Sequence, residues 1–237
     1  MNLEQSTIKI RAEERGIERL CHFTRLSSLP FIIDSGGLFS TYRLKSSRRY
    51  QYLANDHHRL DGHPDHICLS ITVPNARLMW TFASKDSSVD WVVLWLDTSP
   101  LWASGSKFCA VNAAKDSGRH IGSGSAAFAK LFEGKPPASS FTRCPNHRTD
   151  CPTDVQAEVL VEAAIRFEHV KGIFVKSFDD ARKVQGILNS NSHTFPALEI
   201  RVLKSSFFRP EEVKNYVEDR RVPFPAWEEF RRVESHQ

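Results

Sequence analysis

Short runs of β-forming residues recur along this chain, and they do not alternate regularly with helical patterns. The run from Asp90 to Leu96 is almost continuously apolar, which is typical of a buried strand. Helical patterns cover 44–54, 124–133 and 178–189. Because strands outnumber strong helices, we predict a mixed α+β fold rather than a doubly wound sheet. The expected strands lie at 19–24, 66–73, 90–96, 108–111, 158–161, 171–176 and 197–204.

The chain has 237 residues and is 41% hydrophobic, which suffices for one large domain or two small ones. We predict a single domain over 1–237, with a long loop region at 112–152 and a helical tail at 210–237. The longest uncharged run, near 91–105, is broken by Asp97 and Pro100, so no transmembrane helix is expected. The first residues lack the apolar core and cleavage site of a signal peptide. Five cysteines, an odd number, suit free thiols in a reducing compartment. These features predict a cytoplasmic protein without a membrane partner.

A single carboxylate, Glu158, stands at the start of a run that otherwise reads as a buried strand. The preceding Pro152-Thr153-Asp154 marks a turn, and Val159-Leu160-Val161 are β-formers. Desolvating an ionised glutamate is costly unless it meets donors or a substrate. Glu158 is therefore expected to be either a salt-bridge partner or a functional carboxylate, and the run alone favours the salt bridge.

The stretch from Tyr42 to Arg59 combines many cations with aromatic side chains and one acid, Asp56. Cations that meet phosphates beside rings on which bases stack indicate a surface for single-stranded nucleic acid. A solvated helix face with inward tyrosines is the alternative. The residues concerned are Tyr42, Arg43, Lys45, Arg48, Arg49, Tyr50, Tyr52 and Arg59.

Two groups of metal-ligating residue types occur, but neither has a zinc-binding spacing. Cys144, His147 and Cys151 form at most half a site, so free thiols are expected there. The other group lies in a predicted loop, and we predict no metal at either. Its members are Asp56, His57, His58, Asp61, His63, Asp65 and His66. Phosphate-binding glycine motifs and a serine-hydrolase elbow are absent from the sequence.

Four ordered segments give the chain a resemblance to the DarT-type DNA ADP-ribosyltransferases, the toxins of a toxin–antitoxin pair. They are His22-Phe23-Thr24, Leu29-Pro30-Phe31-Ile32 running to Ser35-Gly36-Gly37-Leu38, His66 to Trp80, and Asp154-Val155-Gln156-Ala157-Glu158-Val159-Leu160-Val161. His22 and Thr24 share one face of their expected strand, so they can grip a ligand together. A lone buried histidine is the plainer interpretation.

The resemblance implies an ADP-ribosyltransferase-like split β-sheet with flanking helices and NAD in its cleft. It implies that Glu158 is the catalytic glutamate and that Arg59 acts at the reaction centre, with Arg43 or Arg49 as alternatives. Loop 112–152 would shape the acceptor side. NAD contacts are expected from His22, Phe23, Thr24, Gly37, Leu38, Ser70 and Arg59, and nucleic-acid contacts from Tyr42, Arg43, Arg48, Arg49, Arg119 and Arg148.

The expected function is therefore NAD-dependent ADP-ribosylation of a thymine or guanine base in single-stranded DNA, with a macrodomain antitoxin as partner. Cleavage of the nicotinamide–ribose bond develops positive charge, which a carboxylate stabilises. The alternatives are another NAD-consuming ADP-ribosyltransferase or glycohydrolase acting on RNA or protein, and a non-catalytic nucleic-acid-binding module.

Overall fold

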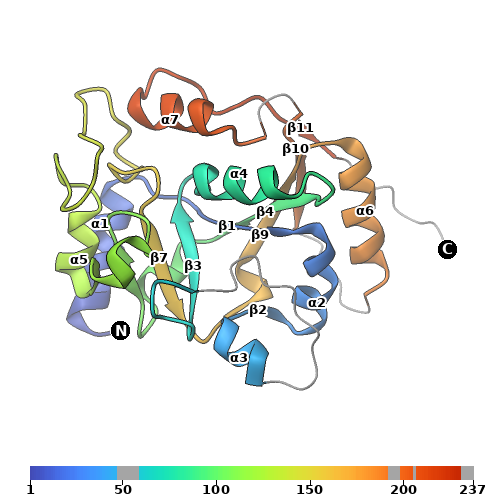
Figure 1. Cartoon of the computed structure of the whole chain (residues 1–237), viewed down its shortest axis with the longest axis horizontal. Coiled ribbons are helices and arrows are strands. Elements are labelled where there is room, and N and C mark those ends of the chain that lie inside the picture. Colours follow the sequence, from blue (N-terminus) through green and yellow to red (C-terminus); the bar gives the residue numbers. More distant parts are fainter. Residues whose placement is uncertain (47–58, 192–197, 205–206, 231–237) are drawn as a thin grey trace.

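A computed structural model describes residues 1–46, 59–191, 198–204 and 207–230. Its centre is a nine-stranded mixed sheet in the order β11-β10-β9-β4-β1-β3-β7-β5-β6 (Figure 1). Only β9 and β10 run parallel among the paired strands described in it. The strands are β1 (Leu20–Arg25), β3 (His66–Ile71), β4 (Trp91–Leu96), β5 (Lys107–Cys109), β6 (Ile121–Ser123), β7 (Glu158–Glu162), β9 (Val170–Val175), β10 (Glu199–Val202) and β11 (Glu228–Glu229).

The sheet splits between β1 and β3. β1 pairs with β4 along its whole length, from Leu20 to Arg25. It pairs with β3 only at Leu20 and Cys21, after which the two strands separate. β3 instead continues antiparallel to β7, which begins at Glu158. The predicted split β-sheet is therefore confirmed, and the gap lies beside the two strands that carry His22 and Cys68.

Helices cover both faces of the sheet (Figure 1). Alternate residues of β4 show why: Val92 and Leu94 belong to one apolar cluster, whereas Trp91 and Val93 belong to the other. The first cluster includes residues of α1 (Leu3–Glu14), α2 (Leu29–Asp34), α5 (Gly124–Lys130) and α6 (Phe178–Asn189). The second includes residues of α4 (Ala76–Lys85) and α7 (Pro210–Glu218). The strands of this sheet come from residues 20 to 229, and a single domain over 1–237 stays a prediction.

Most predicted elements are present, and the C-terminal tail is the main correction. Among its described residues, which end at 230, the tail is helical in α7, and β11 pairs antiparallel with β10 instead of continuing a helix. Pro223 and Pro225 lie in the segment between α7 and β11, where a helix containing them would lose backbone hydrogen bonds. Of the predicted helix at 44–54, residues 44–46 belong to α3 (Thr41–Ser46), and 47–54 lie outside the described residues.

Besides β6 and β11, two further features were not predicted. Helix α4 begins at Asn75, whose side chain accepts a hydrogen bond from the Leu78 amide. Its sequence signals are this N-cap and the inward spacing of Ala76 and Met79. The second is a small antiparallel sheet of β2 (Gly37–Phe39) and β8 (Ala164–Arg166), whose three-residue strands are too short to show a period.

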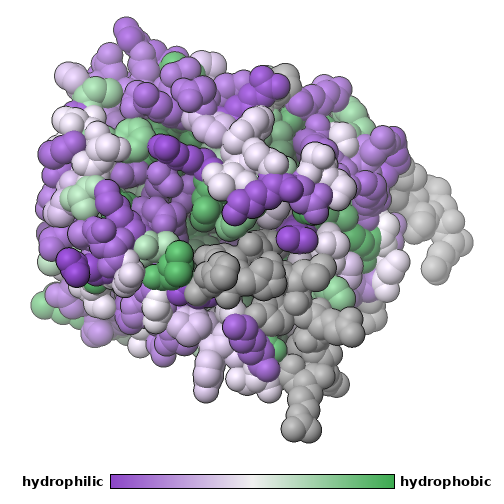
Figure 2. Space-filling view, in the orientation of Figure 1, coloured by the Kyte–Doolittle hydropathy of each residue, from purple (hydrophilic) through white to green (hydrophobic). Residues whose placement is uncertain are grey.

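The face shown in Figure 2 is mostly hydrophilic, with small apolar patches between the polar side chains. Within the described part of the chain, no helix has the length and apolarity needed to cross a membrane.

Candidate functional site

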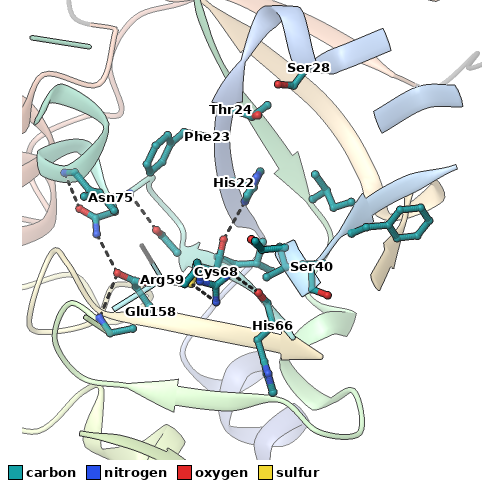
Figure 3. Close-up of a pocket in the computed structure, with 18 of the residues that line it drawn as sticks. His22, Phe23, Thr24, Ser28, Ser40, Arg59, His66, Cys68, Asn75 and Glu158 are labelled. Carbon is teal, nitrogen blue, oxygen red and sulfur yellow. Dashed lines mark hydrogen bonds between the residues drawn. The ribbon is translucent and has the colours of Figure 1, made fainter. Parts of the chain in front are cut away.

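A cavity of about 250 Å³ opens where β1 and β3 separate (Figure 3). β1 contributes His22 and Thr24 to it, β3 contributes Cys68 and Ser70, and β7 contributes Glu158. Residues within segments 28–44 and 112–114 also line it, together with Arg59, Asp61, Asn75, Leu78 and Phe82. All seven residues expected to contact NAD line this cavity: His22, Phe23, Thr24, Gly37, Leu38, Arg59 and Ser70.

His22 hydrogen-bonds a backbone carbonyl of β3 at the point where β1 and β3 have separated. Its Nδ1 lies 2.9 Å from the Cys68 carbonyl oxygen. Because a carbonyl can only accept, Nδ1 carries the proton, and in the neutral ring Nε2 is an acceptor. Burial lowers the pKa of His22, and the positive charge of Arg59 lowers it further, against the raising effect of the Cys68 hydrogen bond. The neutral ring is therefore the form present near pH 7, able to accept a hydrogen bond from a ligand hydroxyl.

Glu158 is buried at the start of β7, and three N–H donors meet one of its oxygens. Oε1 accepts from Asn112 Nδ2 at 3.0 Å, from Asn75 Nδ2 at 3.4 Å and from the Ala113 amide at 3.4 Å. Within the described residues, no lysine or arginine forms a salt bridge with Glu158. The salt-bridge interpretation of Glu158 is therefore not supported, since its hydrogen-bonding partners are neutral.

Burial raises the pKa of Glu158 to about 7, and the nearby carboxylate of Asp61 also raises it. Hydrogen bonds from Cys68 and Ala113 and the charge of Arg59 oppose this shift. Burial and the charge of Glu158 likewise hold the pKa of the Cys68 thiol well above its usual value. A carboxylate whose pKa lies near neutrality can be ionised for one step and accept a proton in another.

Arg59 lies in the cavity wall, as expected, but Asp61 already holds it. Its Nε and Nη2 donate to the two Asp61 oxygens at 3.2 and 2.8 Å, which is a bidentate pair. Nη1 donates to the His66 carbonyl at 2.7 Å, and Nη2 also donates to the His63 carbonyl. The guanidinium therefore acts on Glu158 and His22 through its charge.

The other expected NAD contacts form the cavity walls. The Phe23 ring packs 6.2 Å from Phe82 and 5.8 Å from Trp91, measured between ring centroids. Gly37 and Leu38 lie in β2, and Leu38 is buried. The Oγ of Ser70 accepts a hydrogen bond from the Asn75 amide at 3.0 Å, which ties β3 to the start of α4.

β2 approaches β8 so closely at Gly37 that a Cβ at this position would lie 2.2 Å from the Ile165 carbonyl oxygen. Gly37→Ala must push β2 away from β8, which we expect to lower the free energy of unfolding by about 1–3 kcal/mol. Chemical denaturation measures this change. Gly186→Ala is the matched control, since nothing lies within 4 Å of its added Cβ. Equal stability of the two variants would contradict the close approach of β2 and β8.

The residues expected to contact nucleic acid are spread over the chain. Tyr42 and Arg43 lie on α3, next to the cavity residues Thr41 and Leu44, and Tyr42 is 63% exposed. Arg119 is exposed at the end of the turn that follows 112–114. Arg48 and Arg49 lie outside the described residues.

Arg148 has a different environment from the other predicted nucleic-acid contacts. It pairs with Asp150 at 3.2 Å and stacks 4.1 Å from the centroid of the Tyr216 ring on α7. These contacts give Arg148 a packing role, and we do not retain it as a nucleic-acid contact.

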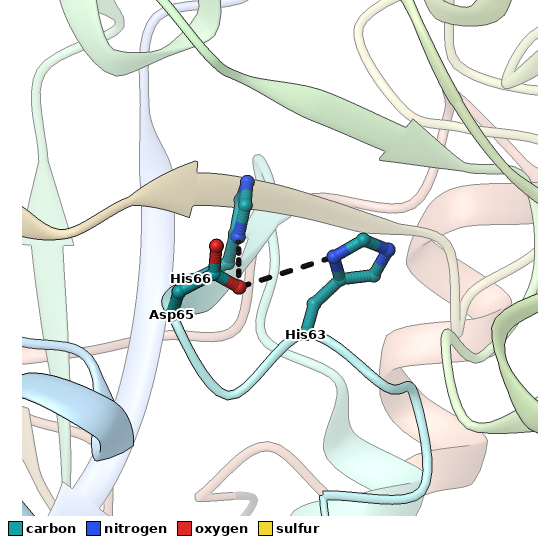
Figure 4. A group of neighbouring side chains, drawn as sticks. All are labelled: His63, Asp65 and His66. Atoms are coloured by element: carbon teal, nitrogen blue, oxygen red, sulfur yellow. Dashed lines mark hydrogen bonds and ion pairs between the residues drawn. The ribbon is translucent and has the colours of Figure 1, made fainter.

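Of the possible metal ligands, His63, Asp65 and His66 come together (Figure 4). Asp65 Oδ1 lies 2.8 Å from His66 Nδ1 and 3.9 Å from His63 Nδ1. The Lys107 ammonium lies 3.3 Å from His63 Nδ1, where its charge would oppose a second cation. We assign no metal to this cluster. Cys144 donates to the Glu218 carbonyl at 2.8 Å, and all five cysteines are free thiols.

Asn75, Asn112 and Asp61 are site residues that sequence reasoning missed. Asparagine and aspartate in loops are normally explained by turns and caps, and each of these residues does make such a local contact. What the sequence does not show is that the far end of each side chain reaches another functional group.

The family model described as "ssDNA thymidine ADP-ribosyltransferase, DarT" matches residues 21–208. A search of curated proteins gave no significant match.

Solved structures of DarT proteins share the fold at low sequence identity. Thermus sp. 2.9 DarT in complex with carba-NAD+ has a TM-score of 0.56 and 15% identity, over 81% of this chain and 97% of that one. Thermus sp. 2.9 DarT in complex with ADP-ribosylated ssDNA has a TM-score of 0.52 and 13% identity, over 80% and 95%. Thermosipho africanus DarTG in complex with ADP-ribose has a TM-score of 0.53 and 13% identity, over 80% and 50%.

Proposed function

The chain belongs to the DarT family of ssDNA thymidine ADP-ribosyltransferases, and we propose that Glu158 is the catalytic carboxylate of its NAD-dependent reaction. The observation that carries this proposal is the position of Glu158. It is a buried carboxylate in the lining of a cavity, held by neutral donors, in the same cavity as the imidazole of His22. Burying a carboxylate without a cationic partner is costly, and a substrate that develops positive charge would offset this cost.

The first chemical step breaks the bond between the nicotinamide nitrogen and C1′ of ribose. Nicotinamide leaves as a neutral molecule, and positive charge develops on the ribose ring. An ionised Glu158 that hydrogen-bonds the ribose hydroxyls stabilises this charge more than it stabilises the neutral sugar. The low dielectric around Glu158 strengthens this interaction.

The second step joins C1′ to thymidine. Position N3 carries the only N–H of the thymine base in a nucleoside, so it is the nitrogen that can exchange a proton for the new bond. As the N3–C1′ bond forms, the N3 proton passes to Glu158, whose pKa of about 7 suits an acceptor near neutral pH. The base must leave any stack to reach a cavity of this kind, which agrees with a single-stranded substrate.

His22, Phe23, Thr24, Gly37, Leu38 and Ser70 would hold NAD in the cavity. His22 would accept a hydrogen bond from a ribose hydroxyl through Nε2, and Phe23 would supply an apolar wall. Arg59 would keep Glu158 ionised through its charge, rather than by binding phosphate with donors that Asp61 already occupies.

For the DNA strand, Tyr42, Arg43 and Arg119 are the proposed contacts. Tyr42 and Arg43 flank the cavity on α3, and Arg119 follows the 112–114 segment on the acceptor side. The similarity to Thermosipho africanus DarTG supports our proposal of a neutralising macrodomain partner.

The test of this function is to incubate the protein and NAD with three acceptors: a thymidine-containing single strand, the matching strand without thymidine, and an RNA of the same sequence with uridine. Intact-mass measurement should show ADP-ribose on the first strand alone. Label on protein, or loss of NAD without any labelled acceptor, would support the alternatives and contradict the proposal.

The pH dependence of the rate is a further prediction. Because Glu158 acts in its ionised form and its pKa is about 7, transfer should increase as the pH rises through 7 and level off above it. Burial lowers the pKa of His22, so its ring is neutral where Glu158 titrates. Single-turnover rates from about pH 5 to about pH 9 measure this profile. A rate that is flat or falls over this interval would contradict an ionised Glu158.

A further inference from the structure

We propose that Asn75 and Asn112 are a pair of positioning residues, which fix one oxygen of the Glu158 carboxylate and leave the other oxygen for the reaction. This inference rests on the role proposed above for Glu158. Neither asparagine was among the residues that the sequence indicated, and the two lie 37 positions apart along the chain.

Asn75 couples the start of helix α4 to the carboxylate (Figure 3). Its Oδ1 accepts from the Leu78 amide at 3.1 Å as the N-cap of α4, so Nδ2 must face away from the helix. Nδ2 then donates to Glu158 Oε1 at 3.4 Å. The backbone of Asn75 is itself held by Ser70, and the residue is buried. The helix cap thereby determines which end of the amide meets Glu158.

Asn112 repeats this arrangement from the loop that follows β5. Its Oδ1 accepts from the Ala114 amide at 3.0 Å, which turns Nδ2 toward Glu158 Oε1 at 3.0 Å. An amide is the side chain that accepts with one end and donates with the other, and aspartate of the same shape cannot do both when ionised. Two asparagines used in the same manner on one oxygen indicate that this donor arrangement is a property of the site.

The arrangement has a chemical consequence for the two oxygens. Oε1 is surrounded by the N–H groups of Asn75, Asn112 and Ala113, so an incoming proton cannot be accommodated there without breaking a hydrogen bond. The proton taken from thymidine therefore goes to Oε2. The two amides also stabilise the charged form of the carboxylate, as donors to an anion do.

Asn75→Ser and Asn75→Asp test this inference, because serine and aspartate both cap helices as well as asparagine does. Serine removes the donor without adding charge, whereas aspartate also places a negative charge beside Glu158. We expect the maximal rate to fall about tenfold in Asn75→Ser. The rise of activity with pH should move to higher pH in Asn75→Ser and further in Asn75→Asp. The KM for NAD should change less than the maximal rate, and the melting temperature should be retained.

Ser177→Ala is the matched control for a lost helix cap. Ser177 caps α6 by accepting from the Asp180 amide, and it does not line the cavity. This variant should lower the melting temperature and leave both the rate and the pH profile unchanged. Should Asn75→Asp fail to fold, Asn112→Asp applies the same test from a segment that caps no α-helix.

The positioning role is overturned if the Asn75 and Asn112 variants keep the rate and pH profile of the natural chain. It is also overturned if their activity falls only in proportion to a loss of folded protein, as a structural role would require. Glu158→Gln, measured in the same assay, separates this failure from that of the proposed function. Activity in Glu158→Gln would refute the role of Glu158 itself, whereas an inactive Glu158→Gln beside unaffected asparagine variants would refute positioning alone.

Discussion

Glu158→Gln is expected to reduce ADP-ribose transfer by about a hundredfold to ten-thousandfold while the protein remains folded. Glutamine has the same shape and can still accept hydrogen bonds from Asn75, Asn112 and Ala113 with its oxygen. It cannot stabilise a developing positive charge as an anion does, and it cannot accept the N3 proton. Quantifying modified single-stranded DNA in a single turnover measures the loss.

Glu162→Gln is the matched control for this variant. Glu162 lies at the other end of β7 and is exposed, so the same substitution there changes charge without entering the cavity. It should transfer at the rate of the natural chain. Near-normal activity of Glu158→Gln, or equal losses in both variants, would contradict the assignment of Glu158.

Glu158→Gln should also make the stability of the fold less dependent on pH. The folded-state pKa of Glu158 is raised from 4.5 to about 7, so the folded state binds more protons than the unfolded state between these values. Stability from this group is therefore present at acidic pH and is lost as the pH rises through 7, to the extent of ~3 kcal/mol. A neutral glutamine removes this dependence. The melting temperature of the variant should accordingly fall less than that of the natural chain between acidic and slightly alkaline pH.

Arg59→Ala is expected to lower the free energy of unfolding by about 3–5 kcal/mol and to abolish transfer. The substitution leaves the buried carboxylate of Asp61 without its bidentate partner. It also frees the carbonyls of His63 and His66, which the guanidinium now holds. Chemical denaturation measures the stability loss, and NAD-dependent modification of DNA measures the activity.

The double variant Arg59→Ala with Asp61→Asn separates the two effects. A neutral amide at 61 removes the unpaired charge, so we expect most of the lost stability to return. The Asp61→Asn change also removes the charge that raises the pKa of Glu158, which offsets the loss of the Arg59 charge. Activity should nevertheless stay low, because the guanidinium in the cavity wall and its hydrogen bonds to the His63 and His66 carbonyls are still missing. If the double variant recovers both properties, Arg59 has a structural role only.

Strands with strong local patterns could be predicted from the sequence, because a buried strand shows as a run of consecutive apolar residues. Trp91–Leu96 is buried almost throughout, and the helix at 178–189 has the predicted bounds. β2 and β8 could not be predicted, since three residues show no period and their pairing depends on distant contacts. The prediction of a helical tail was wrong at Glu228–Glu229, because strand pairing with β10 outweighed the local helical character of these residues.

The site was predictable to the extent that single residues carry its chemistry. Glu158, His22 and Arg59 have side chains whose charge or basicity draws attention in any context, and the fold places all three at one cavity. Asn75 and Asn112 were not predictable, because an asparagine near a helix start or turn is already explained locally. Their second function depends on the split in the sheet, which brings residues 70–75, 112–114 and 158 together.

A structure of the Glu158→Gln variant with NAD bound tests the central claim most directly, since this variant should bind NAD without consuming it. We expect the dinucleotide in the gap between β1 and β3, with the hydroxyls of its nicotinamide-side ribose within hydrogen-bond reach of the side chain at position 158 and His22 in contact with the same molecule. NAD bound outside this gap, or with that ribose turned away from position 158, would contradict the account.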